Sequence, residues 1–491
     1  MTDFAPASLN RMDTQRFANY RANLDFYNGS QWQQTSPARQ DLAGGRHRQL
    51  VFNYAKVSID KVTSFLMPGL GFACYPTTAR LSLRGAQRRS NLETEEAKAR
   101  RAEQLLHQVY DVNNLQQLDY ETEIDAAILG DGCYKVIWDT DEKRIRITAP
   151  DVSGLYAWWL GDDTSRVWRV ASRYTLTQDE IQMLYSDVIA SPDAIGTKQS
   201  QGKDRVMVTE LWTAQTFDLF LDNDLIESKP NPYGFIPFII FPNVKQPKKF
   251  WGESDIPVLV QPQRELNRAL SQLSRILELS GNPIAVLENV ASAEDIKVQP
   301  GALWTIPEDA KAYLLDLLQG GGVRLHVDYI DLLYRSLHDI SELPRAAWGG
   351  VERELSGSAL RIELGSLIQK VIRKRIIRTT VYHQRNDMIL KLGEMFINDN
   401  FEGVNHRVVW GSILPQDVTT QAQNEQLLVQ AGVHSRRTAM DEIGIRDPNE
   451  EFNRWLEERQ KILEMNREFR AASTRGGARA RTVAAETEVP D

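Results

Sequence analysis

The fold is decided by two segments, PQRELNRALSQLSRILELS (Pro262–Ser280) and VRLHVDYIDLLYRSLHDISEL (Val323–Leu343). Each repeats apolar residues at intervals of three and four, which is the spacing of one face of a helix. These apolar positions are Leu266, Leu270, Leu273 and Leu277 in the first segment, and Ile330, Leu333, Leu337 and Ile340 in the second. The sequence therefore predicts two amphipathic helices of similar length that leave a body and return to it as a stalk.

The opposite faces of the two predicted helices are polar. They carry Arg264, Arg268, Gln272 and Arg275 in the first helix, and Asp328, Asp331, Arg335 and Asp339 in the second. Asp331 precedes Arg335 by four residues, the favourable order for an ion pair within a helix. Proline is tolerated at the start of a helix, so Pro262 marks the beginning of the regular part of the first one.

The residues between these helices, 281–322, favour short strands over helix. Apolar runs at Ile284–Leu287 and Ala302–Ile306 are separated by Pro300 and Gly301, and the second run is closed by Pro307. Such short runs between proline and glycine are typical of strands. We therefore expect a small β-containing tip at the end of the stalk.

A loop and a third helix follow the stalk. Arg345–Gly357 contains Gly349 and Gly350, which interrupt a helix. From about Ser358 the helical spacing returns and continues toward Phe396. The inward positions expected there are Leu360, Leu364, Leu367, Ile368, Val371 and Ile372, and a basic stripe on another face comprises Lys370, Arg373, Lys374 and Arg378.

The N-terminal half combines helices with a β pattern. Helices are expected at 11–32, Val51–Phe65 and Leu92–Leu129, and strands at Tyr134–Trp138, Arg144–Thr148, Val167–Tyr174, Arg205–Thr213 and Thr216–Leu221. A short strand is expected at Arg407–Trp410. After it, Gly432 ends one helix, and Ser435 and Asp447 are expected to cap two others. The predicted class is therefore α+β.

Composition narrows the range of functions. A chain of 491 residues is too long for a single core, so several substructures are expected. Its net charge of −8 argues against a protein that wraps nucleic acid with a basic surface. Cys74 and Cys133 are too few for a disulfide framework or a thiolate metal site. No signal peptide or long apolar segment is present in the sequence. We therefore expect the protein to be made in the cytoplasm and not to associate with a membrane.

The sequence contains no recognisable catalytic motif. Phosphate-loop, H-E-x-x-H and G-x-S-x-G patterns are missing, so we predict no enzyme activity, no cofactor, and no catalytic or metal-binding residue. The alternative is a carboxylate-metal-dependent nucleic-acid enzyme that uses Glu121, Glu123 or Asp125. Their alternate spacing spreads these carboxylates around a helix, which does not favour a shared ion.

Several motifs occur in an order that resembles a known family. They are PYGFIPF (Pro232–Phe238), FWGESDI (Phe250–Ile256), Leu266-Asn267 and SGSAL (Ser356–Leu360). Together with the stalk they resemble the portal, or head-to-tail connector, proteins of tailed double-stranded DNA bacteriophages, over about Tyr20 to Glu468.

This resemblance implies an arrangement of parts. The wing would span 1–255, the stem helices 256–280 and 323–343, the clip 281–322, the tunnel loop 344–357, and the long helix with its return to the wing 358–413. A helical crown would occupy 414–470, and 471–491 would be a disordered tail. The resemblance also implies a homo-oligomeric ring of about twelve copies.

The resemblance implies a function as well. The ring would sit at the capsid portal vertex of the virion, after assembly in the host cytoplasm, and conduct double-stranded DNA during packaging and ejection without sequence specificity. Its partners would be the terminase large subunit, head-completion or tail adaptor proteins, and the major capsid and scaffolding proteins. A monomeric helical adaptor, with stem and clip folded back on the same chain, is a second alternative.

The resemblance further assigns site residues. The tunnel loop, facing DNA, would include Arg345, Trp348, Gly349, Gly350, Glu352 and Arg353. The docking residues of the clip would be Asn282, Glu288, Glu294, Lys297, Trp304 and Lys311. The polar stem residues would be Arg264, Arg268, Arg275, Asp331 and Arg335. For the basic stripe of the third helix, ion pairs with acidic residues of a neighbouring wing are favoured over a position facing the channel.

Overall fold

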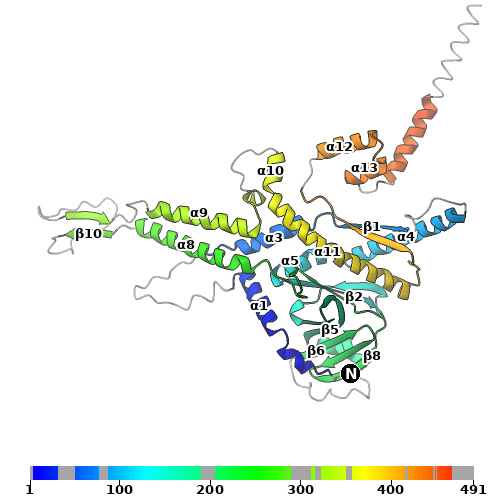
Figure 1. The fold of residues 1–491 in the computed structure, drawn as a ribbon, viewed down its shortest axis with the longest axis horizontal. Coiled ribbons are helices and arrows are strands. Elements are labelled where there is room, and N and C mark those ends of the chain that lie inside the picture. Colours follow the sequence, from blue (N-terminus) through cyan, green and yellow to red (C-terminus); the bar gives the residue numbers. More distant parts are fainter. Residues whose placement is uncertain are drawn as a thin grey trace, which may run out of the picture. The chain divides into compact units, whose positions relative to one another are not determined.

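The computed structural model describes residues 4–30, 50–76, 87–189, 205–281, 284–288, 311–315, 322–349, 357–414, 418–445, 448 and 450–466. The chain divides into two compact units, Met1–Ile413 and Leu414–Asp491. Helices and separate antiparallel sheets coexist in the first unit (Figure 1). This confirms the predicted α+β class.

Four helices precede the sheets of the first unit: α1 (Thr14–Asn28), α3 (Tyr54–Leu66), α4 (Gln87–Val112) and α5 (Leu115–Leu129). Helix α1 ends at Gly29, which has a left-handed φ of 72°. Helix α3 is capped by Asn53, whose side chain accepts a hydrogen bond from the Lys56 amide at 3.1 Å. The helix predicted at 92–129 is divided because Asn114 adopts a left-handed φ of 48°.

Two antiparallel sheets form most of the β structure. One is a meander of β4 (Leu155–Leu160), β5 (Asp163–Thr177), β6 (Arg205–Thr213), β7 (Thr216–Leu221) and β8 (Asp224–Pro230). Helix α6 (Gln178–Ile189) follows β5. The other sheet has the order β3-β2-β9, formed by β3 (Arg144–Thr148), β2 (Asp131–Asp139) and β9 (Phe238–Pro242). The strands predicted in the N-terminal half are confirmed, with β2 and β3 paired antiparallel, and both sheets contribute buried residues to one core.

The predicted stalk is present as α8 (Pro257–Gly281) and α9 (Gly322–Ser341), which lie side by side (Figure 1). Between them, β10 (Ile284–Glu288) and β11 (Lys311–Leu315) form an antiparallel pair. Helix α8 begins earlier than predicted, at Pro257, and includes Pro262. Just before it, Ser254 accepts a hydrogen bond from the Ile256 amide at 3.0 Å. The strand predicted at Ala302–Ile306 lies outside the described residues.

The third predicted helix is present as α10 (Gly357–Glu363) and α11 (Gly365–Leu392), preceded by the short turn η4 (Arg345–Trp348) and followed by a π-helical turn (Gly393–Ile397). Leu364, Leu367 and Val371 are buried as expected. The prediction for Ile372 is wrong, since its side chain is 40% exposed. Finally, β12 (Val404–Val409) pairs antiparallel with β1 (Gly71–Pro76), which confirms the predicted strand near Arg407.

The second unit is helical in its described part. It contains α12 (Val418–Gln430), α13 (Arg436–Glu442) and a helical segment at 450–466. Gly432, with φ of 70°, follows α12. Ser435 caps α13 as predicted, because its hydroxyl accepts a hydrogen bond from the Thr438 amide at 3.1 Å. Asp447 and the predicted tail at 471–491 lie outside the described residues.

Candidate channel and interface sites

The root of α8 is fixed to the segment before α3 by buried amide side chains. Asn267 is fully buried; its Oδ1 accepts from the Phe52 amide at 3.0 Å and its Nδ2 donates to the Phe52 carbonyl at 3.2 Å. Gln263, also fully buried, accepts from the Ala55 amide at 2.8 Å. The stalk therefore starts from a rigid base.

The contact between α8 and α9 follows the predicted seam near the body. Leu266 and Leu337 are each 1% exposed, and the Tyr329 hydroxyl donates to Glu265 across the two helices at 3.0 Å. Ile340, predicted to lie in the seam, is 46% exposed. The prediction is wrong there because His338 and Ser341, on a neighbouring stripe, are the buried residues at the end of α9.

The predicted polar stem residues lie on the outside of the two helices. Arg264, Arg268, Arg275 and Arg335 are exposed. Arg268 pairs with Glu265 at 2.8 Å, and Arg335 forms the expected ion pair with Asp331. Exposed pairs of this kind contribute little to stability, about 0–1 kcal/mol each. These side chains therefore determine the charge of the stem surface more than its folding.

Large apolar side chains remain exposed on the stalk and on the helices after the loop. On α8 and α9 they include Leu277 (52% exposed), Leu325 (72%) and Leu332 (59%). On α10 and α11 they include Ile362 (82%) and Ile376 (65%). A soluble monomer rarely exposes many large aliphatic residues on adjoining elements. These positions are candidates for burial against another protein surface.

The described start of the predicted tunnel loop is held by aromatic contacts. Trp348 is half-buried, with its ring centroid 5.6 Å from that of Tyr54 and 5.2 Å from that of His338. Arg345 lies over the ring of Tyr334, 5.6 Å from its centroid. Gly349 takes a left-handed φ of 86° directly after this turn. Gly350, Glu352 and Arg353 lie outside the described residues, so their DNA contacts stay a prediction.

His338 is a buried member of this aromatic cluster. Its Nδ1–H donates to the Leu343 carbonyl at 2.8 Å, where the chain leaves α9. Burial lowers the pKa of His338 and the nearby Arg345 charge lowers it further, against the opposing effect of this hydrogen bond. The ring is therefore neutral at physiological pH, and it supports the end of α9 without carrying charge into the loop.

Most of the basic stripe of α11 is buried inside its own subunit, whereas Arg373 is exposed and pairs with Glu342 of the same chain. Arg378, 1% exposed, donates from Nε and Nη2 to the two carboxylate oxygens of Glu123, each at 2.7 Å. Lys374 Nζ lies 2.7 Å from Asp255 Oδ2. The expectation of pairing with a neighbouring wing is therefore wrong for these residues, and so is a channel-facing position. The polar stripe has its acidic partners within the chain.

The same network connects the stem to α11. Lys370 lies 3.3 Å from Asp255, which precedes α8, and donates to the carbonyl of Ser341, the last residue of α9, at 3.1 Å. Burial alone would raise the pKa of Asp255, but the charges of Lys374 and Lys370 outweigh it and hold this pKa well below its usual range. One ionised carboxylate thus joins both stem helices to the long helix.

The described part of the clip is a two-stranded pair. Glu288 and Lys311 face one another in the register of β10 and β11, and both are exposed. Opposite charges directly across two strands favour the pairing. Asn282, Glu294, Lys297 and Trp304 lie outside the described residues, so the docking surface stays a prediction.

The carboxylates of the alternative enzyme function do not form one site. Glu123 is bound by Arg378, whereas Glu121 is exposed and accepts a hydrogen bond from Gln117 at 2.7 Å. Asp125 is also exposed and lies one turn after Glu121 on the same face of α5, where partial desolvation and, to a lesser extent, the Glu121 charge raise the pKa of Asp125. The prediction that the three carboxylates diverge is therefore confirmed for Glu123, which is occupied by its ion pair, and wrong for Glu121 and Asp125.

Comparison with protein families decides the identity of the chain. Residues 8–465 match the model of the family described as phage portal protein, SPP1 Gp6-like. The chain belongs to the phage portal protein family. A comparison with curated proteins finds no matching sequence. The match covers both the stalk and the wing, so the resemblance seen in the ordered motifs is confirmed.

Membership of the portal family gives the coarse function. Portal proteins are structural head-to-tail connectors of bacteriophages that serve DNA packaging, and they are not enzymes. The family implies an oligomeric ring associated with the capsid vertex. Every described helix of this portal subunit is too short or too polar to traverse a lipid bilayer.

Proposed function

We propose that about twelve copies of this portal subunit form a ring around a channel that conducts double-stranded DNA during packaging and ejection. The observation that carries the proposal is the family match over residues 8–465. The ring would be assembled in the host cytoplasm, with major capsid and scaffolding proteins as partners, and retained at the capsid vertex of the virion.

The exposed aliphatic residues support an interface between copies. Leu325 and Leu332 on α9 and Ile376 on α11 lie on elements that the Lys370 contacts join. Burying a leucine or isoleucine side chain contributes about 1.5–3 kcal/mol. A ring that covers these positions in every subunit would gain this free energy many times over.

The stem, loop and clip would then have separate tasks. The buried network at Asp255 would keep the stem rigid while DNA passes. The loop after Trp348 would narrow the channel through Glu352 and Arg353, and Gly349 and Gly350 would let it shift as DNA passes. The clip, around Glu288 and Lys311, would bind the terminase large subunit during packaging and head-completion or tail adaptor proteins afterward.

The test of the ring is the mass of the assembled protein. We expect native mass spectrometry and single-particle imaging of the purified chain to give a closed ring of about twelve subunits. Leu332→Asp combined with Ile376→Asp should shift the mass toward the monomer, because burying a new charge at an interface is unfavourable.

The matched control is Met183→Asp. Met183 on α6 is 85% exposed, so this change also adds charge at an exposed apolar position, but it lies outside the stem and the long helix. The control should keep the ring. A wild-type chain that stays monomeric at high concentration, with and without a scaffolding protein, would contradict the proposal.

A further inference from the structure

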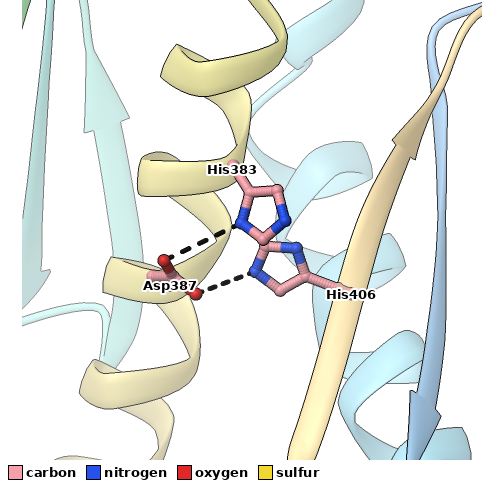
Figure 2. A group of neighbouring side chains, drawn as sticks. All are labelled: His383, Asp387 and His406. Carbon is pink, nitrogen blue, oxygen red and sulfur yellow. Dashed lines mark hydrogen bonds and ion pairs between the residues drawn. The ribbon is translucent and has the colours of Figure 1, made fainter. Parts of the chain in front are cut away.

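Three potential metal ligands meet where α11 contacts β12. His383 and Asp387 are one turn apart on α11, and His406 projects from β12 toward them (Figure 2). His406 Nε2 lies 3.0 Å from Asp387 Oδ1, and His383 Nδ1 lies 3.9 Å from Asp387 Oδ2. One ligand atom from each residue can be chosen so that all three lie within 4.8 Å of one another. In the part of the chain that the structure describes, no other group of this kind occurs.

The distances fit a small divalent ion. Zinc binds imidazole nitrogen at about 2.0–2.1 Å and carboxylate oxygen at about 2.0–2.2 Å, so neighbouring ligand atoms of a tetrahedral site are about 3.4 Å apart. One ligand atom from each residue can be chosen with all separations within 4.8 Å, which exceeds this value by at most about 1.4 Å. Closing the site around an ion would therefore need side-chain movements of about an ångström.

The donor set and the burial also fit. Two imidazoles and one carboxylate suit zinc and neighbouring transition metals, whereas magnesium and calcium prefer oxygen ligands. His406 is 2% exposed, and its Nδ1 has no hydrogen-bond partner among the described residues. The side chains of His383 and Asp387 are 45% and 55% exposed, so solvent can supply the fourth ligand.

The two imidazole rings also lie in contact with one another. The imidazole centroids of His383 and His406 are only 4.1 Å apart, with the ring planes inclined by 35°. A bound cation would satisfy both imidazoles and the carboxylate together.

We propose that His383, Asp387 and His406 bind a divalent transition-metal ion of the zinc type, which links the long helix α11 to β12. Because β12 pairs with β1, the ion would fasten this two-stranded sheet to the helix that carries the buried Arg378 and Lys374 network. The role is structural. The ion makes the wing more stable but takes no part in a reaction.

The test uses the full-length protein after removal of metal with a chelator. Calorimetric titration with zinc chloride should show about one ion bound per chain, and zinc should raise the unfolding temperature. Cobalt should give the visible absorption of a tetrahedral site without a sulfur charge-transfer band. Asp387→Asn and His383→Ala alter half-exposed side chains, so both variants should fold, and each should lose at least tenfold in zinc affinity.

Two controls separate this site from adventitious binding. His434 lies 2.8 Å from Glu425 in the second unit, a pair with only two ligands, so His434→Ala should leave the titration unchanged. Cys74 faces His406 in the β1–β12 register, and Cys74→Ser should also have no effect. The proposal is overturned by no zinc binding in the wild type, or by equal affinity in Asp387→Asn, His383→Ala and the wild type. Loss of binding only in His434→Ala would assign the ion to the second unit and overturn it too.

Discussion

At the scale of single residues, the buried guanidinium of Arg378 shows how an ion pair that stabilises the fold prevents a carboxylate from serving another function. It donates to both oxygens of Glu123 and, through Nη1, to the Pro242 carbonyl at 2.8 Å. A buried charge is tolerated only when its partners are present. The same pair also occupies Glu123, so a structural contact removes one of the three carboxylates considered for enzyme chemistry.

We expect Arg378→Met to lower the free energy of unfolding by about 3–5 kcal/mol, because it leaves the buried Glu123 carboxylate with only the more distant Lys374 ammonium, 4.0 Å away. Adding Glu123→Met to the same chain should recover much of this loss. Urea unfolding of the two single variants and the double variant measures the coupling. Arg373→Met is the control, since the Arg373–Glu342 pair is exposed and should contribute about 0–1 kcal/mol. Equal losses in the Arg378 and Arg373 variants would show that the buried pair does not stabilise the wing.

At the scale of elements, the FWGESDI motif is explained by a close approach of backbones. Gly252 lies against the end of α5 and the end of β9, and its amide donates to Asp131 at 2.7 Å. A Cβ atom at this position would be 2.4 Å from the Gly130 carbonyl oxygen and 2.6 Å from the Pro242 Cβ. Only glycine fits, so the motif fixes the chain where it leaves the β3-β2-β9 sheet and enters α8.

Gly252→Ala should therefore lower the free energy of unfolding by about 1–3 kcal/mol, the usual cost of overpacking. Gly322→Ala is the matched change at the start of α9, where an added Cβ meets no atom within 4 Å, and it should be neutral. Thermal and urea unfolding compare the two variants. If Gly252→Ala left the free energy of unfolding unchanged, the backbones at this junction would be able to move apart without loss of stability.

At the scale of the whole molecule, charge and assembly have to be considered together. Each chain carries a net charge of −8, and the described basic residues of α11 near the stem are largely paired within the subunit. A channel made of such subunits would hold DNA weakly, which suits a duplex that must move. Any restraint on DNA then has to come from a local element, and the loop after Trp348 is the candidate.

We expect the triple variant Trp348→Ala, Glu352→Ala and Arg353→Ala to assemble into rings but to retain packaged DNA poorly. The physical reason is the loss of the Glu352 and Arg353 charges proposed to narrow the channel, and of the Trp348 contacts with Tyr54 and His338 that hold the start of the loop. Packaging efficiency and DNA retention in assembled particles are the measurements, with Arg264→Ala in the exposed stem as control. Unchanged packaging and retention in the triple variant would remove the gating role of the loop.

Features that depend on residues close together in the sequence could be predicted, whereas contacts between distant residues could not. Helices α8 and α9, the hairpin of β2 and β3, and the Ser435 cap were predictable because periodicity, turn residues and caps act over a few residues. The burial of Lys374 and Arg378 was not, because charged residues at helical spacing normally mark a solvated face. The pattern of His383 and Asp387 was a weak signal for a metal site, as its third ligand lies on another element.

The sequence by itself determined the α+β class, the two-helix stalk with its β-containing tip, and the ordered motifs that indicate a portal subunit. These features depend on local spacing and on residue order, which can be read along the chain. Only the tertiary structure decided that the basic stripe of α11 pairs with Glu123 and Asp255, and that His406 meets His383 and Asp387. Those contacts join residues far apart in sequence, and they form because α5, α11 and β12 pack around one core.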